Sequence, residues 1–370
     1  MKHPIKSLTK RLILSALALS TFAIASFSHA AGTLNVYNWS DYIDDSVLKD
    51  FEAKTGIKVR YDVFDSNEVL ETKLLAGSTG YDIVVPSAYF LGRQVQAGVF
   101  EKLDKDKLPN LKNMDPTIMK LASESDPDNA YSINYLWGTT GIGYNEAKVK
   151  AALPDVPLDS WDLVFKPENL SKLKDCGVFF LDGPTEIIPA AMNYLGLDYK
   201  KPDADSLKKV EELMEKIRPN IRKFHSSEYI SALANGDICL AVGWSGDILQ
   251  ATNRAIEAKN GHVIKYIIPK EGAQLFMDQM AIPKDAKNKD EAYQFMNYLM
   301  EPEVMAKISN KVSYASGNLA AKAFVNKEIT ENANIYPPED VMKKLYVMPI
   351  FDSKTTRLVN RSWTKIKSGH

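Results

Sequence analysis

The sequence predicts an α/β fold arranged as two lobes, and three observations support this prediction. Short apolar runs alternate with helix-like segments from residue 33 onward, and a second stretch of the same kind covers residues 159–261. Between these stretches, small residues separate strand-like runs, as expected where a chain passes from one lobe to another. With 370 residues, 45% of them hydrophobic, the chain is long enough for two domains with cores of their own.

The first stretch has the order strand, helix, strand, helix, strand. The expected strands cover residues 33–37, 57–64 and 81–85, and the expected helices cover residues 44–56, 66–77 and a short segment that ends at Gly98. An acid-rich start and a closing glycine mark the first helix, and Ser66 is the expected cap of the second. This order is typical of a parallel sheet with helices on its faces, in which ligands bind beyond the carboxyl ends of the strands.

Two crossings between the lobes are expected. The first involves strand candidates at 131–137 and 141–145, separated by Gly138-Thr139-Thr140, and the second involves the strand candidate 262–268. The second lobe has strand candidates at 178–181 and 238–243 and helix candidates at 167–173, 186–195, 206–217, 227–234 and 246–259. A strand at 278–282 and helices at 289–300 and 303–309 follow the return. We therefore predict one lobe from residues 31–135 plus 262–312 and another from residues 136–261 plus 313–370.

Residues 1–30 have the pattern of a signal peptide. Basic residues between Lys2 and Arg11 precede an apolar run that ends at Phe27, and Ser28-His29-Ala30 has the small-x-small form of a cleavage site. A membrane anchor is the alternative, although the run is shorter than the roughly 20 residues of a typical span. We expect cleavage after Ala30 and an exported, soluble protein. The formal net charge of −1 gives no reason to expect nucleic acid or an anionic membrane as a partner.

Export makes the two cysteines informative. Cys176 and Cys239 each lie in an apolar run of strand length. Half-buried cysteines in an oxidising compartment usually pair, and a disulfide across a loop of this length stabilises by roughly 4 kcal/mol on the chain-entropy estimate. Two free buried thiols are the alternative.

An aromatic residue with an acid two or three positions later occurs three times at the end of, or just after, a strand-like run. The three segments are Trp39-Ser40-Asp41, Trp244-Ser245-Gly246-Asp247 and Phe276-Met277-Asp278. An aromatic face attracts a cation by roughly 0.5 to 2 kcal/mol, and a carboxylate adds a charge-assisted hydrogen bond. Each aromatic ring alone is better interpreted as core or rim packing, and each acid could cap a helix or form a turn. Together they predict a cavity suited to an alkyl ammonium ion.

An enzyme is the main rival class. The histidines are His3, His29, His225, His262 and His370, which show no metal-ligand spacing and offer no partner for a nucleophile. The glycine-rich segments 77–80 and 138–143 lack the residues of phosphate-binding and dinucleotide-binding loops and are better interpreted as turns. Paired carboxylates could in principle act on glycosides, but we expect no catalytic residue, no cofactor and no metal.

Seven runs stand in order along the chain: Tyr37-Asn38-Trp39-Ser40-Asp41-Tyr42-Ile43, Val63-Phe64-Asp65-Ser66-Asn67-Glu68, Asp82-Ile83-Val84-Val85-Pro86-Ser87, Thr140-Gly141-Ile142-Gly143-Tyr144-Asn145, Phe224-His225-Ser226-Ser227, Leu233-Ala234-Asn235-Gly236-Asp237-Ile238-Cys239 and Ile268-Pro269-Lys270-Glu271-Gly272-Ala273. They resemble the periplasmic polyamine-binding proteins of bacterial ABC transporters, and in particular the putrescine-binding branch. The similarity runs from about Leu34 to Lys367. It implies a type II periplasmic binding protein, whose two α/β lobes are joined by a hinge and close on a ligand in the cleft, and a membrane permease as partner.

The resemblance also implies roles for individual residues. The expected ligand contacts are Ser40, Asp41, Ser87, Glu186, Asp247 and Asp278, the expected aromatic walls are Trp39, Trp244, Phe276 and Tyr314, and the family's disulfide falls on Cys176 and Cys239. Tyr89 is the eleventh expected binding residue; it stands where the putrescine pattern has serine and is similar to spermidine binders, whereas Gly183 lacks an aspartate that some spermidine binders have. We expect a monomeric periplasmic protein that binds putrescine. Spermidine, mixed specificity, or a polyamine sensor with the same fold are the alternatives.

Overall fold

Residues 32–369 are described by a computed structural model and form one compact unit. The predicted signal peptide and the alternative membrane anchor lie outside the described residues. Within residues 32–369, no helix is both long enough and apolar enough to cross a membrane.

The strands of the described chain form one mixed sheet. They are β1 Thr33–Trp39, β2 Lys58–Phe64, β3 Ile83–Val84, β4 Ser132–Asn145, β5 Val178–Phe180, β6 Lys223–Phe224, β7 Leu240–Trp244, β8 Ile264–Ile267, β9 Leu275–Ala281 and β10 Ala315–Ser316. Their order along the sheet is β2-β1-β3-β9-β4-β7-β5-β6, and β8 and β10 also pair with β4. As predicted, β1, β2 and β3 are parallel, so the chain leaves all three at the same edge.

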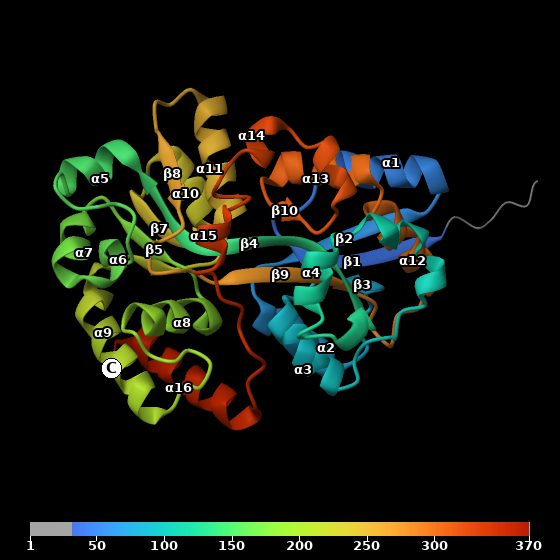
Figure 1. The fold of residues 1–370 in the computed structure, drawn as a ribbon, viewed down its shortest axis with the longest axis horizontal. Helices are drawn as coiled ribbons and strands as arrows, with labels where there is room; N and C mark the ends of the chain where they lie inside the picture. Colours follow the sequence, from blue (N-terminus) through green and yellow to red (C-terminus); the bar gives the residue numbers. More distant parts are fainter. Residues whose placement is uncertain (1–31, 370) are drawn as a thin grey trace, which may run out of the picture. The chain divides into compact units, whose positions relative to one another are not determined.

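The helices cover the faces of this sheet (Figure 1). They are α1 Asp45–Thr55, α2 Asn67–Ala76, α3 Ala88–Gln96, α4 Pro116–Ala122, α5 Glu146–Ala152, α6 Asp162–Phe165, α7 Pro167–Leu173, α8 Pro184–Tyr194, α9 Ala204–Ile217, α10 Tyr229–Asn235, α11 Ser245–Ala258, α12 Lys289–Leu299, α13 Pro302–Val312, α14 Lys327–Thr330, α15 Glu339–Met342 and α16 Ser353–Ser368. Local signals set their ends. Asp44 caps α1, Ser66 caps α2 as expected, and Gly56 closes α1 in the left-handed conformation, with φ 74°.

The long strand β4 corrects one expectation. Residues 131–137 and 141–145 were expected as two strands, but Gly138, Thr139 and Thr140 continue a single strand of 14 residues. The small residues do not form a turn but allow β4 to lie close to its neighbours. A Cβ on Gly138 would lie 2.9 Å from the ring of Phe276. Figure 1 shows β4 running from the group of β5, β7 and β8 to the group of β1, β2 and β3.

Two separate hydrophobic cores lie on either side of this crossing. The first contains β1, β3, β9, α12 and α13, and the second contains β5, β7, α8, α9 and α11. The predicted disulfide joins Cys176, which precedes β5, to Cys239, which precedes β7, with a Cα–Cα distance of 5.4 Å. The disulfide therefore lies at the start of β7, whereas Trp244 is at the end of that strand.

Candidate functional site

A pocket lies where the ends of strands from both cores meet across β4. The volume of this pocket, measured out to its opening to solvent, is about 400 Å³. Its lining consists of Trp39, Ser40, Tyr42, Ser87, Glu186, Trp244, Asp247, Phe276, Asp278 and Tyr314. Nine of these ten residues are among the eleven predicted from the sequence. The strand register explains the convergence, since Gly138 of β4 is opposite Phe276 and Thr140 is opposite Trp244.

Aromatic rings form the walls of this pocket. The ring centroids of Trp39 and Trp244 are 5.5 Å apart at 73°, so the tryptophan that ends β1 meets the one that ends β7 edge to face. Phe276 continues the wall beside Trp244, with 6.4 Å between ring centroids, and Tyr314 follows at 6.1 Å from Phe276. Trp39 is held from behind because its indole Nε1–H donates to the carbonyl of Val85 at 2.8 Å. Such walls shield methylene groups from water and present π faces to a cation.

Asp278 is the acid of the first core. It lies on β9, is only 3% exposed, and accepts hydrogen bonds from Ser87 Oγ at 2.6 Å and Tyr42 Oη at 2.7 Å. Ser87 is placed for this by Asn67, whose side chain exchanges two hydrogen bonds with it. Burial raises the pKa of Asp278 to about 7, although the two hydroxyl donors oppose this shift.

Asp247 is the acid at the start of α11, in the second core. It is 5% exposed and accepts hydrogen bonds from Tyr229 and Tyr314, each at 2.7 Å. Gly246, directly before it, allows Tyr314 to come close, because a Cβ at that position would lie 2.3 Å from the tyrosine ring. Burial raises the pKa of Asp247 to about 7 against the effect of both tyrosine hydroxyls.

Glu186 is the acid of the first turn of α8. It accepts a hydrogen bond from Thr140 Oγ1 at 2.6 Å, and Tyr89 Oη lies 3.4 Å from its other oxygen. Burial is again the largest cause that raises its pKa, to about 7, and the negative charges of Glu68 and Asp278 add to the effect.

The three buried carboxylates share one property. Among the described residues, none of Glu186, Asp247 and Asp278 forms an ion pair with a lysine, arginine or histidine. A buried carboxylate without a cation is unfavourable, and a bound cation would stabilise its charged form. The pocket is therefore suited to a small ligand with more than one positive charge and an apolar middle.

Two predicted residues lie outside this lining. Asp41 turns away in the left-handed conformation (φ 53°), and its carboxylate pairs with Arg254 of α11 at 2.6 Å. Tyr89 lies on the other side of Glu186. It lines an adjoining hollow of about 220 Å³ that shares Trp39, Glu186 and Trp244 with the pocket and also contains Asp65, Glu68 and Asp182.

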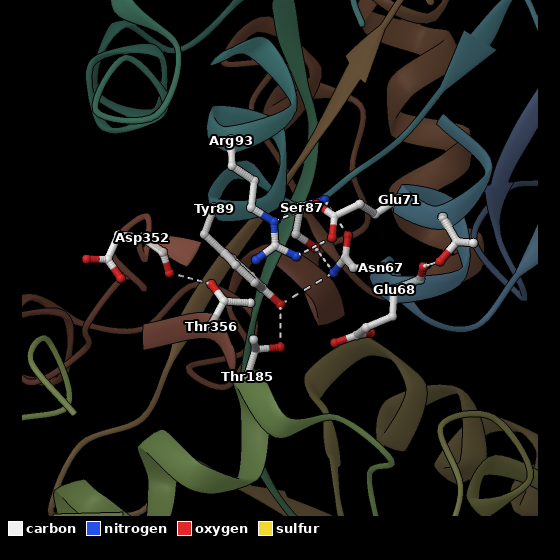
Figure 2. A network of polar contacts seen from close by, with 10 residues as sticks. Asn67, Glu68, Glu71, Ser87, Tyr89, Arg93, Thr185, Asp352 and Thr356 are labelled. Atoms are coloured by element: carbon white, nitrogen blue, oxygen red, sulfur yellow. Dashed lines mark hydrogen bonds and ion pairs between the residues drawn. The ribbon is translucent and has the colours of Figure 1, made fainter. Parts of the chain in front are cut away.

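Figure 2 shows how Tyr89 spans this region. From α3 its hydroxyl reaches Thr185 of α8, with 2.9 Å between the oxygens, and Asn67 lies between Tyr89 and Ser87. Glu68 also lies beside this network (Figure 2).

Sequence reasoning missed three residues that hold the carboxylates. Tyr42 lies inside the first aromatic and acid segment, so its proximity to Asp41 was an available signal. Tyr229 and Thr140 carried no local signal, because each reaches its carboxylate only through the pairing of β4 and β7 and the packing of α10 on α11.

The described residues offer no group of three or more His, Cys, Asp and Glu side chains arranged to hold a metal ion. Nδ1 of His225 accepts hydrogen bonds from the backbone N–H groups of Ser227 and Glu228.

Two α/β cores joined by crossing strands, with one pocket lined from both, define a two-lobe solute-binding protein of the type II periplasmic class. The structure is similar to the spermidine/putrescine ABC transporter substrate-binding protein PotD of Streptococcus pneumoniae, with a TM-score of 0.73 and 33% identity, over 92% of this chain and 99% of that one.

The chain belongs to the bacterial extracellular solute-binding proteins, whose family model matches residues 46–337. It is 57% identical to the putrescine-binding periplasmic protein PotF of Escherichia coli (strain K12), over 95% of this chain and 96% of that protein. It is 58% identical to the putrescine-binding periplasmic protein SpuD of Pseudomonas aeruginosa (strain UCBPP-PA14), over 94% of this chain and 95% of that protein. These relatives are binding proteins and not enzymes.

Proposed function

We propose that this protein is the periplasmic substrate-binding component of a polyamine ABC importer, and that it binds putrescine in the pocket and delivers it to the membrane permease. One observation carries the proposal: three buried carboxylates without a cationic partner among the described residues converge on an aromatic-walled pocket. Putrescine supplies two ammonium groups and a flexible tetramethylene chain. The names of the relatives PotF and SpuD support the same ligand.

In the proposed complex, Asp278 and Asp247, with Ser40 and Ser87, hold one ammonium group, and Glu186 compensates the other. Trp39, Trp244, Phe276 and Tyr314 enclose the methylene groups. Asp41, which is paired with Arg254, lies outside the pocket lining and would influence the second ammonium group only from a distance. With about 6 non-hydrogen atoms at a ceiling of about 1.5 kcal/mol each, the binding free energy cannot be much stronger than roughly −9 kcal/mol, which corresponds to a Kd somewhat below micromolar.

Spermidine is the second candidate ligand, and the adjoining hollow favours it. The hollow continues from the pocket past Glu186 and presents Glu68, Asp182 and the ring of Tyr89. Asp182 already pairs with Lys367 at 2.6 Å, whereas Glu68 forms no ion pair among the described residues. A third ammonium group beyond the second would therefore meet Glu68 first.

Calorimetric titration of the mature protein with putrescine, spermidine, spermine and 1-aminobutane tests the proposal. We expect putrescine to bind more tightly than spermidine. We also expect 1-aminobutane, which keeps four carbons and one charge, to bind at least 100-fold more weakly, as expected for the loss of one buried ion pair of about 3 kcal/mol. Equal binding of 1-aminobutane and putrescine would contradict the role of the carboxylates. Tighter binding of spermidine would replace putrescine by the second candidate.

Transport requires that the ligand stabilise the closed arrangement of the two lobes. A ligand that contacts residues of both cores binds this arrangement more tightly than an open one. We propose that a membrane permease recognises the closed arrangement, that the protein acts as a monomer, and that the exported chain begins at Ala31. A polyamine sensor would share the pocket but would not support uptake. Uptake of labelled putrescine by cells that lack or express the gene distinguishes the two roles, and N-terminal sequencing of the periplasmic protein tests the cleavage site.

For the lobes we propose the expected division, 31–135 plus 262–312 and 136–261 plus 313–370, with two adjustments supported by the cores. Ile264 and Tyr266 pack in the second core, and residues 314–335 contribute to the first. The return crossing then lies between β8 and β9, and α16 is the part of the C-terminal region that belongs to the second lobe. Limited digestion with trypsin, with cleavage expected first after the exposed Lys270, Lys343 and Lys344, checks these limits.

A further inference from the structure

A third, small hydrophobic cluster lies between the two cores. It consists of Tyr89 and Phe90 of α3 with Tyr346 and Met348, and Tyr199 and Phe351 pack against it. Tyr199 and Phe351 also contact the second core, whereas Leu91, the next residue of α3, belongs to the first. The cluster therefore spans both lobes, and Tyr89, which lines the adjoining hollow, is one of its members.

Residues 343–352, here called the strap, carry Tyr346 and Met348 along the return crossing. Leu275 N–H donates to the carbonyl of Tyr346 at 2.7 Å, and Tyr346 N–H donates to the carbonyl of Ala273 at 3.0 Å. Phe276, which lines the pocket, is the residue after Leu275. The backbone of Tyr346 is thus fixed to the strand that supplies Phe276 and Asp278.

The side chain of Tyr346 packs in the same cluster as Tyr89. It is 8% exposed, and its ring stacks on that of Tyr199, with centroids 4.3 Å apart and an interplanar angle of 33°. Its hydroxyl is buried and has no hydrogen-bond partner among the described residues. The strap presses on α3 at a second point, where a Cβ on Gly92 would lie 2.2 Å from Ile350. Packing of the ring, rather than hydrogen bonding, is therefore what Tyr346 contributes.

We propose that Tyr346 is a positioning residue that holds Tyr89 at the edge of the adjoining hollow and so sets the preference between a diamine and a longer polyamine. This inference rests on the proposed function. Tyr89 has support of two kinds: its hydroxyl is held by polar contacts with Thr185, Asn67 and Glu186, and its ring packs in the cluster that contains Tyr346. If the second support is lost, the ring no longer lines the hollow. Binding in the inner pocket changes little, because Tyr89 is not part of its lining.

The test measures the ratio of the spermidine Kd to the putrescine Kd. Removal of Tyr89 as a wall of the hollow, in Tyr89→Ser, is expected to shift this ratio toward putrescine. Tyr346→Leu is expected to shift it in the same direction by about 5-fold to 10-fold, roughly 1 to 1.4 kcal/mol. Tyr346→Phe keeps the ring and is expected to leave the ratio unchanged. In the Tyr89→Ser background, Tyr346→Leu should have no further effect on the ratio.

Tyr298→Leu is the matched control, because Tyr298 is 7% exposed and packs in the first core on Phe51 and Phe295. It should lower the stability as Tyr346→Leu does but leave the ratio unchanged. If Tyr346→Leu does not fold, Tyr199→Leu removes the stacking partner from a partly exposed position and is expected to shift the ratio in the same direction. An unchanged ratio in whichever of these two variants folds, with polyamine binding intact, overturns the inference. Absence of any polyamine binding by the wild type would overturn the proposed function instead.

Discussion

Replacement of Asp278 by asparagine should have opposite effects on ligand affinity and on stability. The change keeps the shape of the side chain and removes one charge. Asparagine Oδ1 can still accept from one of the two hydroxyls that now reach Asp278, and the Ser87 hydroxyl can turn to accept from the new amide. The variant should therefore fold with an intact pocket.

The affinity loss follows from the buried charge pair. An ammonium group about 4 Å from a carboxylate gains ~4 kcal/mol at an effective dielectric constant of about 20. Relief of the desolvation of Asp278 reduces this value, so we expect a loss of about 2 to 4 kcal/mol, a putrescine Kd about 30-fold to 1000-fold higher.

The stability should change in the other direction. The pKa of Asp278 is raised from 3.8 to about 7 in the fold, and this difference corresponds to roughly 4 kcal/mol. Because the folded pKa is the higher one, the contribution of this group to stability is fully present below about pH 4 and is lost as the pH rises through about 7. Ligand-free Asp278→Asn should therefore be more stable than the wild type at pH 8 and similar to it at pH 4.

Calorimetric titration at pH 8 and urea unfolding of the ligand-free protein at pH 4 and pH 8 measure both effects. Asp50→Asn is the matched control, since Asp50 forms an exposed ion pair with Lys307 and should change neither quantity by more than about 1 kcal/mol. A putrescine affinity within 3-fold of the wild type would refute the assignment of Asp278. Lower stability of the variant at pH 8 would refute the argument from burial.

Three further predictions concern other parts of the site. Because Glu186, Asp247 and Asp278 have pKa values of about 7, putrescine binding near pH 7 should release protons and weaken from pH 8 to pH 6; equal calorimetric enthalpies in buffers of different ionisation enthalpy would argue against this. Asp41→Asn should weaken binding by less than about 1 kcal/mol, since its ion pair with Arg254 is partly exposed, and a loss as large as that of Asp278→Asn would show direct contact with the ligand. Cys176→Ser with Cys239→Ser should lower the free energy of unfolding by about 2 to 5 kcal/mol but leave the putrescine Kd within 2-fold, and a large change in Kd would place the disulfide in the coupling between the lobes.

Local patterns were sufficient where a residue's role depends on its neighbours in the chain. Trp39 and Trp244 are the last residues of β1 and β7, and strand ends in an α/β sheet gather at one edge, so their convergence followed from the pattern. The expectation that Phe276 stands at the end of a strand was wrong: it is the second residue of β9, which is antiparallel to β3 and therefore starts at that edge. The caps at Ser66 and Gly56 are equally local. The pairing of Cys176 with Cys239 needed only two cysteines and an oxidising compartment.

Other features depend on residues that are distant in the sequence. Asp41 belongs to the same short segment as Trp39, yet a left-handed backbone directs it to Arg254, more than 200 residues later. The hydroxyl partners of the carboxylates, Tyr229 and Thr140, come from α10 and the middle of β4, which no short pattern relates to the acids.

The sequence by itself determined the order of strands and helices, the presence of two cores and most of the aromatic and acidic residues of the pocket, because apolar periodicity and strand-end position are properties of short segments. Tertiary structure alone decided which acids are buried without a cation, that β4 passes unbroken between the cores, and that Tyr346 of the strap and Tyr89 of α3 share one hydrophobic cluster. These depend on burial and on contacts across the sheet, and the free energy of a charge or a ring at a given position is set by what surrounds it in space.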